Sequence, residues 1–568
     1  MNTASMAQVK HNTQRIAALA HEVVGQARNE EERWKSFLQL HAALQELKRR
    51  QQKKKKGVEP SGPTRDDLEQ LRVWLLKNGL DSKWLEGIEF AANLPEGSGV
   101  VAKKDFKKGE PFLQVPRKLM FTCQAMQNTP LGQLLKVDKF LAQSPSLCLA
   151  LHLLVEKHNH SSFWTPYIKT LPKSYGTCLY FTLEELEGLR GSPTFTSAIK
   201  VIATVAIQYT YIHDLFQIRK DILHINAFTW DEFIWAMSAV GSRQNQVPQW
   251  GHNALSEYAL IPAWDMCNHD HGDLQTFWDV NSDSTESHAM RAYKKGEQVY
   301  IFYGPRPNSD LLLHAGFVYE NNRFDALAIR VRLAPDAEHI KDKLRLLHLN
   351  NMKMDSQYYL YGLGLAVDLM AFLRIHAMNE QELQQVLGAY DQQEAKVHNG
   401  EHPASNGEVV ASGVFDPRVK LNDRNELAAL QLAEAKCLSL LSLYPTTLQV
   451  ANGVELKQED QAALRTTSLT PNMRAVTLLR LKEKEILNRT LDAIRLLKGE
   501  VGGTVGAAPS PASSSSNGTV APAQQPSKNK KRKNRKKKTA AAAATTSEES
   551  ETPAAASSPT TEEKDRTA

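Results

Sequence analysis

Residues 260–271 read LIPAWDMCNHDH, an apolar lead followed by an unusually dense cluster of polar and ionisable groups. Three interpretations compete for this cluster. His269, His271 and the nearby aspartates could ligate a metal ion, but no third ligand group stands at a recognisable spacing. Cys267 and His269 could form a nucleophile pair, although close neighbours in a chain seldom bring both side chains together productively. The remaining interpretation is a ligand-binding turn, in which Asn268 and His269 make hydrogen bonds to the backbone or to a cofactor.

A second segment, residues 296–304, reads GEQVYIFYG: a turn, a strand and a glycine stop. Taken alone, such a segment is more often a core strand than a site, but its Tyr303 has to be weighed beside the Asn-His turn. Upstream, residues 97–102 read GSGVVA and match the G-x-G-x-x-A pattern of dinucleotide-binding folds. That pattern must open a helix, whereas strand-like residues follow here, so a Rossmann fold is not expected. A glycine turn before a strand, close enough for backbone to approach a ligand, is the prediction.

Composition and periodicity divide the chain into four segments. Residues 1–64 form a helical and basic extension, in which 13–47 have helical spacing and a Gly/Pro linker follows the basic run. Residues 65–330 are richest in aromatic residues and motifs. Residues 331–500 are mostly amphipathic helix. Residues 501–568 turn to Gly, Ala, Pro, Ser and Thr around a Lys/Arg run, which predicts disorder because too little apolar surface can be buried.

The apolar pattern also places individual elements. Strands are expected at 99–103, 110–116 and 298–303, and helices at 128–157, 183–191, 195–218 and 229–240. The last helix should begin cleanly, since Thr470 can cap it and Pro471 fits its first position. Its buried stripe is predicted to contain Leu479, Ile486, Ile494 and Leu497.

The composition excludes several classes of protein. The 568 residues are 42% apolar and 23% charged, so the chain is not disordered throughout. No run reaches the roughly 18 uninterrupted apolar residues of a membrane span, and the first thirty residues lack a signal-peptide core. Five widely spaced cysteines without a Cys-x-x-Cys argue against disulfides and structural zinc, and fit a reducing, intracellular compartment.

The net charge of +6 is concentrated in two short runs. Residues 48–56 contain seven Lys/Arg and residues 528–538 contain nine, which leaves the rest of the chain at −10. A protein surface with a net negative charge is poorly suited to bind nucleic acid. The run at 528–538 fits a nuclear address, an RNA or ribosome contact, or a solubilising tail. Because it lacks aromatic residues, any nucleic-acid contact should be weak, nonspecific and sensitive to salt.

Four motifs, in their order and spacing, resemble the SET-domain protein methyltransferases. They are EGSG (96–99) with Val115-Pro116, FWTPY (163–167) with Leu171-Pro172, SRQNQ (242–246), and WDMCNH (264–269) with Tyr303-Gly304. The resemblance covers residues 65–500 and is to the subgroup that includes the Rubisco large-subunit lysine methyltransferase. It implies an α+β fold: a β-rich SET core with a helical insertion at 65–330, an all-helical substrate-binding domain at 331–500 and a disordered C-terminal tail.

The resemblance also implies S-adenosyl-L-methionine as cofactor and no metal ion. By matching positions, the cofactor-binding residues would be Arg65, Glu96, Gly97, Ser98, Arg243, Asp265, Met266, Cys267, Asn268, His269, Tyr303, Ala315, Gly316 and Phe317. Phe317 would lie near the adenine. Tyr303 would also be catalytic, with its hydroxyl lining the methyl-transfer channel.

Two departures from the related lysine methyltransferases bear on the target residue. Those enzymes resemble Ser-Arg-Ala-Phe where this chain has Ser-Arg-Gln-Asn, ending at Asn245, and carry a small residue where it has Trp264. Both departures are similar to the members of the subgroup that methylate a histidine of actin at Nε2. Asn245 would then be catalytic and substrate-binding, because its side-chain oxygen can accept Nδ1–H and leave Nε2 nucleophilic. Trp264 and Arg306 would hold the target peptide.

Protonation also favours histidine as the target. Histidine is mostly neutral at pH 7, whereas lysine must lose a proton at a cost of about 4.6 kcal/mol. Two other classes remain open: a lysine methyltransferase acting on a histone or another protein, and a non-enzymatic scaffold or nucleic-acid binder. We expect actin as the protein substrate, a monomer, no membrane contact, and a cytoplasmic location that extends to the nucleus if residues 528–538 are a nuclear address.

Overall fold

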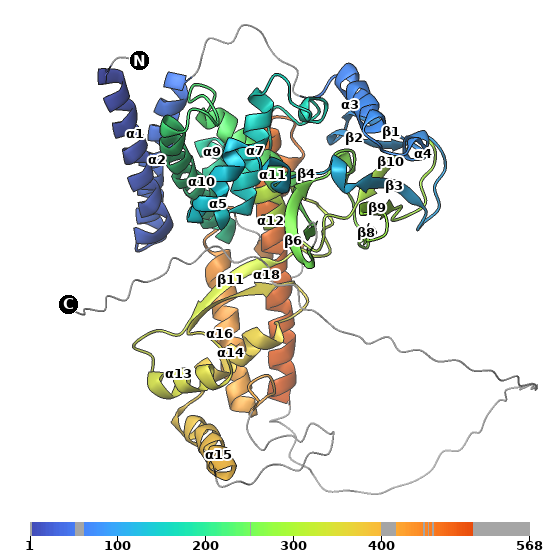
Figure 1. Cartoon of the computed structure of the whole chain (residues 1–568). Coiled ribbons are helices and arrows are strands. Elements are labelled where there is room, and N and C mark those ends of the chain that lie inside the picture. The colour runs from blue at the N-terminus through green and yellow to red at the C-terminus, as the bar shows by residue number, and fades with distance from the viewer. Residues whose placement is uncertain are drawn as a thin grey trace, which may run out of the picture. The chain divides into compact units, whose positions relative to one another are not determined.

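The structure is a computed structural model (Figure 1), and it describes residues 3–51, 62–249, 252–398, 416–446, 449–451, 454–456 and 459–503. Most of the segment predicted to be a disordered tail, with the basic run at 528–538, lies outside these residues, as do Lys53 to Lys56 of the first basic run.

The first part of the described chain, up to residue 326, alternates helices with short strands. Its helices are α1 (Thr3–His21), α2 (Glu30–Gln51), α3 (Arg65–Lys77), α4 (Ser82–Glu86), α5 (Pro130–Val137), α6 (Lys139–Ala142), α7 (Pro145–His158), α8 (Thr165–Ile168), α9 (Leu183–Glu187), α10 (Pro193–Ile218), α11 (Trp230–Arg243) and α12 (Asn308–Asp310). Its strands are β1 (Ile88–Leu94), β2 (Gly97–Ala102), β3 (Pro111–Pro116), β4 (Phe121–Thr122), β5 (Asn245–Gln249), β6 (His252–Leu260), β7 (Asn268–His269), β8 (Thr276–Asp279), β9 (Ser284–His288) and β10 (Gln298–Ile301).

The helix predicted at 128–157 is divided into α5, α6 and α7. Asp138 ends α5 and caps α6, since its carboxylate accepts a hydrogen bond from the Leu141 N–H at 3.0 Å. Pro145 then opens α7 at a position where a proline costs no hydrogen bond. The helices predicted at 183–191, 195–218 and 229–240 appear close to their expected positions.

The strands form three small sheets, in the orders β1-β2-β10-β7, β3-β9-β8 and β4-β6-β5. β10 pairs antiparallel with β2 and parallel with β7, where Tyr300 faces Asn268. The sheet therefore brings the segments 296–304 and 264–269 side by side. β2 and β3 do not pair with each other, although turn residues separate them: β2 pairs with β1 and β10, and β3 with β9.

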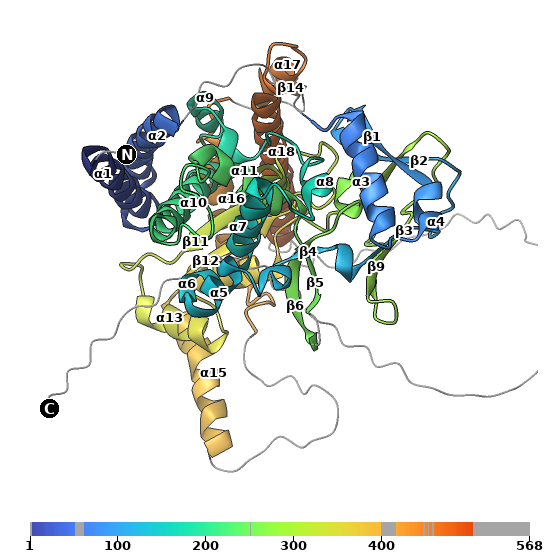
Figure 2. The same ribbon diagram turned by 45° about the horizontal axis from the view of Figure 1, so that its top comes forward.

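The N-terminal extension is part of the main core. The single helix predicted at 13–47 is instead two helices, separated by a π-helical turn (Glu22–Gln26) and a break that ends at Asn29. The Asn29 side chain accepts a hydrogen bond from the Glu32 N–H at 2.8 Å and so starts α2 afresh. Ile16 and Phe37 are fully buried in the same hydrophobic cluster as α10, and Figure 2 shows α1 and α2 beside that helix.

α10 has the length and composition of a membrane-spanning helix, with a mean hydropathy of 1.2 over its most apolar window. In the fold, 56% of that window is buried, and the helix packs against α1, α2 and α11. Tyr209 and Phe216 are among its fully buried side chains. The apolar residues of α10 are thus explained by its place in the protein core.

The second part is mostly helical, but it begins with a two-stranded antiparallel sheet that the sequence analysis missed. Its elements are β11 (Leu327–Arg332), α13 (Ile340–Leu349), β12 (Asp355–Leu360), α14 (Val367–Ala377), α15 (Glu380–His398), α16 (Asp423–Leu441), β13 (Gln449–Ala451), β14 (Val454–Leu456), α17 (Glu459–Leu464) and α18 (Pro471–Gly503). β11 pairs antiparallel with β12, and β13 with β14. Together with the first part, these elements confirm the predicted α+β fold, but the prediction that residues 331–500 are all-helical was wrong, since they include β12, β13 and β14.

α18 joins the two hydrophobic clusters of the molecule. It starts as predicted, because the Thr470 hydroxyl accepts a hydrogen bond from the Met473 N–H at 3.1 Å. Leu479 is buried in the first cluster, whereas Ile486 and Ile494 are buried in the second. The predicted stripe was wrong at its end, since Leu497 is 38% exposed.

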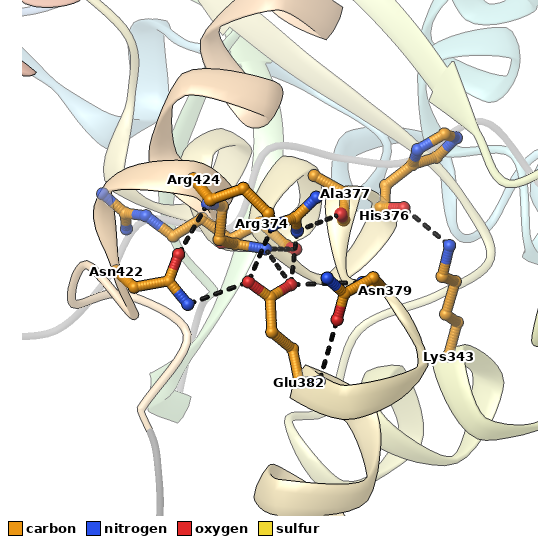
Figure 3. A network of polar contacts seen from close by, with 9 residues as sticks. Lys343, Arg374, His376, Ala377, Asn379, Glu382, Asn422 and Arg424 are labelled. Carbon is orange, nitrogen blue, oxygen red and sulfur yellow. Dashed lines mark hydrogen bonds and ion pairs between the residues drawn. The ribbon is translucent and has the colours of Figure 1, made fainter. Parts of the chain in front are cut away.

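A polar network fixes the junction of α13, α14, α15 and α16 (Figure 3). Glu382 and Asn379 exchange backbone-to-side-chain hydrogen bonds at the start of α15, in the manner of a capping box. The Glu382 carboxylate also accepts hydrogen bonds from Arg424 and from Asn422. Lys343, on α13, donates to the His376 carbonyl at 2.8 Å near the end of α14. The junction is therefore held by directional contacts in addition to apolar packing.

Candidate active site

A cavity of about 210 Å³ brings together six of the predicted site residues, from three separate stretches of chain. These residues are Arg243, Asn245, Trp264, Asp265, Tyr303 and Arg306. Helix α11 ends at Arg243, strand β5 begins at Asn245, and β10 ends just before Tyr303. Residues from the motifs at 242–246, 264–269 and 296–304, which the sequence analysis identified separately, thus line one cavity.

The amide of Asn245 is anchored by its own backbone. Its Nδ2 donates to the Arg243 carbonyl at 3.0 Å. A carbonyl oxygen can only accept, so the NH₂ end must face it, and Oδ1 is the other end of the group. Among the described residues no hydrogen-bond donor reaches Oδ1. A residue of the cavity lining therefore has an acceptor oxygen without a donor, on an amide that is already anchored.

Trp264 follows a residue with a strained backbone conformation. Its indole Nε1 donates to the hydroxyl of Thr276 at 3.2 Å, and both residues line the cavity. The residue before it, Ala263, has φ +72°, a region that residues with a Cβ rarely occupy. Backbone strain of this kind persists where the surrounding contacts over-determine it, and it clusters at functional sites. Nothing in the sequence marks Ala263 for this conformation.

A buried charged group lies behind the cavity. The Asp265 side chain is 1% exposed and accepts a hydrogen bond from the Tyr167 hydroxyl. The Arg243 guanidinium lies 3.6 Å from Asp265 Oδ1 and also donates to the Asp265 carbonyl. Burial raises the pKa of Asp265 to about 6, although Arg243 and Tyr167 both favour its charged form. The sequence analysis named Asp265 and Arg243 but missed the part that Tyr167 plays.

The raised pKa of Asp265 predicts a pH dependence of stability. The unfolded carboxyl loses its proton near pH 3.9, whereas the folded one keeps it to about pH 6. The folded state therefore binds more protons in between, so the free energy of unfolding falls as pH rises through this window. Asp265→Asn has no titrating group at this position. Between pH 4 and pH 6.5, the free energy of unfolding of the wild type should fall by on the order of 2 kcal/mol relative to that of the variant. Urea unfolding of both proteins at several pH values measures the difference, and a difference independent of pH would contradict the assignment.

A second group of predicted residues gathers beside the cavity, where β2, β10 and β7 adjoin. Asn268 Nδ2 donates to the Ser98 carbonyl at 3.0 Å and to Gln298 Oε1 at 2.6 Å. A Cβ at Gly99 would lie 2.9 Å from Asn268 Nδ2, so only glycine allows the two strands to approach this closely. Glu96 accepts a hydrogen bond from Gln298 Nε2 at 3.0 Å. The glycine turn predicted at 97–102 is thus a place of close backbone approach.

Aromatic rings continue this group. The Tyr303 hydroxyl donates to the Cys267 carbonyl at 2.8 Å, and its backbone N–H donates to His269 Nδ1 at 3.2 Å. The rings of His269 and Phe317 are 5.9 Å apart. Burial, with His271 as a smaller cause, lowers the pKa of His269 to about 4, so the ring is neutral at pH 7. Gly316, before Phe317, has φ +83° and packs directly on backbone at Gly176, which excludes any Cβ there.

The side chains of several predicted residues take no direct part in these contacts. The side chains of Met266 and Cys267 are buried in the core, so only their backbone can face a ligand. Burial also raises the pKa of the Cys267 thiol, which argues against a nucleophile. Ala315 ends the π-helical turn Leu311–Ala315, and Arg65 is exposed at the first position of α3, outside this group of contacts. No set of three or more His, Cys, Asp or Glu in the described part of the chain could hold a metal ion, so the metal interpretation gains no support.

The fold and this site together define a SET-domain protein with a second, substrate-binding domain. Residues 97–304 match the SET domain family model, and residues 334–487 match the Rubisco LSMT substrate-binding model. Among solved structures, Rubisco LSMT bound to AdoMet aligns over 78% of this chain and 94% of its own, with a TM-score of 0.58 and 21% identity. The SET domain of LSMT bound to lysine and AdoHcy aligns with a TM-score of 0.59 over 77% of this chain and 93% of its own, also at 21% identity.

Curated relatives of known activity show to which group of SET-domain proteins the chain is similar. The actin-histidine N-methyltransferase of Gallus gallus is 32% identical over 465 residues, which cover 81% of this chain and 73% of the relative. The enzyme of the same name from Homo sapiens is 32% identical over 468 residues, with the same coverage. The chain belongs to the SET-domain methyltransferase family of the actin-histidine N-methyltransferases.

Proposed function

We propose that this protein transfers a methyl group from S-adenosyl-L-methionine to Nε2 of a histidine in actin. The names of the curated relatives support the reaction and the substrate. The observation that carries the proposal is the anchored amide of Asn245, a residue that lines the cavity and whose Oδ1 has no hydrogen-bond donor among the described residues. A phenylalanine at this position, as in the resembling lysine enzymes, would have no acceptor to offer.

The residues beside the cavity fit the cofactor. Arg243 Nε is buried and has no hydrogen-bond partner among the described residues, so a donor with positive charge is available for a carboxylate such as that of the methionine moiety. The Cβ position at Gly97, with φ +103°, meets no atom within 4 Å, which leaves open space beside the backbone. We assign cofactor binding to this backbone, to Arg243, Asn268 and His269, and to the ring of Phe317. When bound, the cofactor supplies a sulfonium methyl group, which a neutral nitrogen can attack.

The chain's own groups would then select one nitrogen of the target ring. Oδ1 of Asn245 accepts the Nδ1–H of the imidazole, which fixes the tautomer and leaves the lone pair on Nε2. Trp264, held by Thr276, packs beside the ring, and the buried wall formed by Ile301 and Phe302 keeps water from the reacting atoms. After transfer the ring carries a positive charge until Nδ1 releases its proton to solvent. Catalysis in this scheme is positioning in near-attack geometry.

The test is a transfer assay with purified full-length protein, labelled S-adenosyl-L-methionine and purified actin. We expect one labelled histidine in the mass spectrum, with the methyl group on Nε2 when the isolated amino acid is compared with standards. A label on lysine would replace this proposal with the lysine methyltransferase alternative. Incubation of the same protein with a cell lysate, followed by mapping of the modified residue, would show whether a protein other than actin is the better substrate.

A further inference from the structure

Arg117 is a charged residue behind the cavity that the sequence motifs do not include. It follows β3, as the first residue of the 3-10 helix Arg117–Leu119, and its side chain is only 11% exposed. Its Nε donates to both carboxylate oxygens of Asp283 at 3.0 Å, and its Nη1 donates to the Pro248 carbonyl at 2.7 Å. Nη1 also lies 3.7 Å from Glu257 Oε1. The guanidinium therefore has acceptors on several sides.

These contacts join two separate sheets. Pro248 is on β5 and Glu257 on the adjoining β6, in the sheet β4-β6-β5. Asp283 is in the turn between β8 and β9, in the sheet β3-β9-β8, and the guanidinium carbon lies 4.6 Å from the ring centroid of Trp278 on β8. Arg117 is thus a planar cation placed between the two sheets, in contact with a cation–π partner and with carboxylates.

Both of these sheets contribute residues to the lining of the cavity. Pro248 and Trp278 both line it, and Arg117 contacts both of them from outside. Pro248 stands three residues after Asn245 on β5, and Trp278 stands two residues after Thr276, the partner of the Trp264 indole. A change in the separation of β5 and β8 would therefore move the acceptor of Asn245 relative to the ring of Trp264.

We infer that Arg117 is a positioning residue, which sets the distance between the β5 and β8 walls and so aligns the target imidazole for transfer at Nε2. The inference rests on the proposed function for the identity of the target ring. Lysine cannot replace this arginine, because an ammonium group has no planar face for Trp278 and no rigid set of donors that reaches Asp283 and the Pro248 carbonyl together. Misplacement of the reacting groups by about 1 Å is enough to reduce a rate about 100-fold.

The experiment compares wild type with Arg117→Lys and Asp283→Asn. Asp283 has φ +47°, a conformation that asparagine also accepts, so Asp283→Asn weakens the contact without disturbing the turn. The matched control is Arg330→Lys, because Arg330 also donates to both oxygens of a carboxylate, from Nε and Nη2 to Asp355 at 2.6 and 2.9 Å, but is 72% exposed and lies on β11. Melting temperature, cofactor affinity by calorimetry, kcat, and the ratio of Nε2- to Nδ1-methylhistidine are measured for each protein.

We expect kcat to fall about tenfold or more in both test variants, with cofactor affinity unchanged and a new fraction of Nδ1-methylated product. The control should match wild type in every measurement. Unchanged kcat and unchanged product in a folded variant would overturn the inference, as would a loss of cofactor affinity that accounts for the whole loss of rate. If Arg117→Lys does not fold, Asp283→Asn decides. The wild-type product tests the proposed function separately: methylation of lysine would reject that function, and Arg117 would then be judged on the ratio of variant to wild-type kcat alone.

Discussion

Replacement of Asn245 by phenylalanine is expected to lower kcat/KM for the histidine substrate about 100-fold, equivalent to about 2.7 kcal/mol of transition-state stabilisation. The variant removes the side-chain oxygen that we propose accepts Nδ1–H. The contact of the amide with the Arg243 carbonyl shows that it is already oriented in the free protein. Without that acceptor the target ring can present either tautomer and either nitrogen. Initial rates with an actin peptide, over a range of peptide concentrations, measure the effect.

Asn245→Asp is the matched comparison, because it keeps an acceptor oxygen and nearly the same volume. It should retain far more activity than the phenylalanine variant. Adding Trp264→Ala to Asn245→Phe removes a large buried ring from the cavity wall and should admit a lysine side chain, so a peptide with lysine in place of histidine becomes methylated. Wild-type rates of histidine transfer in the double variant would remove Asn245 from the mechanism.

The largest expected effect on stability comes from Asp460→Ala, far from the cavity in sequence. Asp460 forms ion pairs at 2.7 Å with both Arg480 and Lys484 of α18, and the side chains of Asp460 and Lys484 are each 2% exposed. Removing one partner of a buried pair leaves the other charge without compensation, which costs about 3–5 kcal/mol. We expect a loss of that size in the free energy of unfolding, measured by urea denaturation.

Asp355→Ala is the control for Asp460→Ala. It breaks a contact of similar geometry, but its partner Arg330 is 72% exposed, so the loss should stay below about 1 kcal/mol. A double variant, Asp460→Leu with Lys484→Met, should be less destabilised than Asp460→Ala, because it removes both charges of the Asp460–Lys484 pair together. Equal losses in Asp460→Ala and Asp355→Ala would show that burial of the pair is not what sets its contribution.

Much of the local structure could be predicted from the sequence, because it depends on nearby residues. The start of α18 at Pro471 follows from Thr470 and a proline that suits a first turn, and β10 follows from alternating residues between two glycines. The segments around Asn245, Trp264 and Tyr303 could be identified because each carries a motif with a chemical reason. Their residues do meet at one cavity.

The remaining features depend on contacts between distant parts of the chain. Arg117 and Asp283 are 166 residues apart, and Tyr167 and Asp265 are 98 apart, so no periodic pattern could pair them. The left-handed backbone at Ala263 is imposed by its surroundings and contradicts the ordinary preference of alanine. Leu497 fits the helical stripe by spacing, but α18 is less covered at its far end, and periodicity alone cannot show where the cover stops.

The dual role of α18 bears on how this enzyme family can acquire new targets. Val476 and Leu479 complete the core that supports the cavity, while Leu487 and Ile494, further along the same helix, complete the core of the substrate-binding half. Replacing the substrate-binding half together with α18 would remove side chains from the hydrophobic core that supports the cavity. New specificity is therefore expected to arise through altered surface residues on an inherited pair of domains, since recombination at the boundary would cost the enzyme its own support.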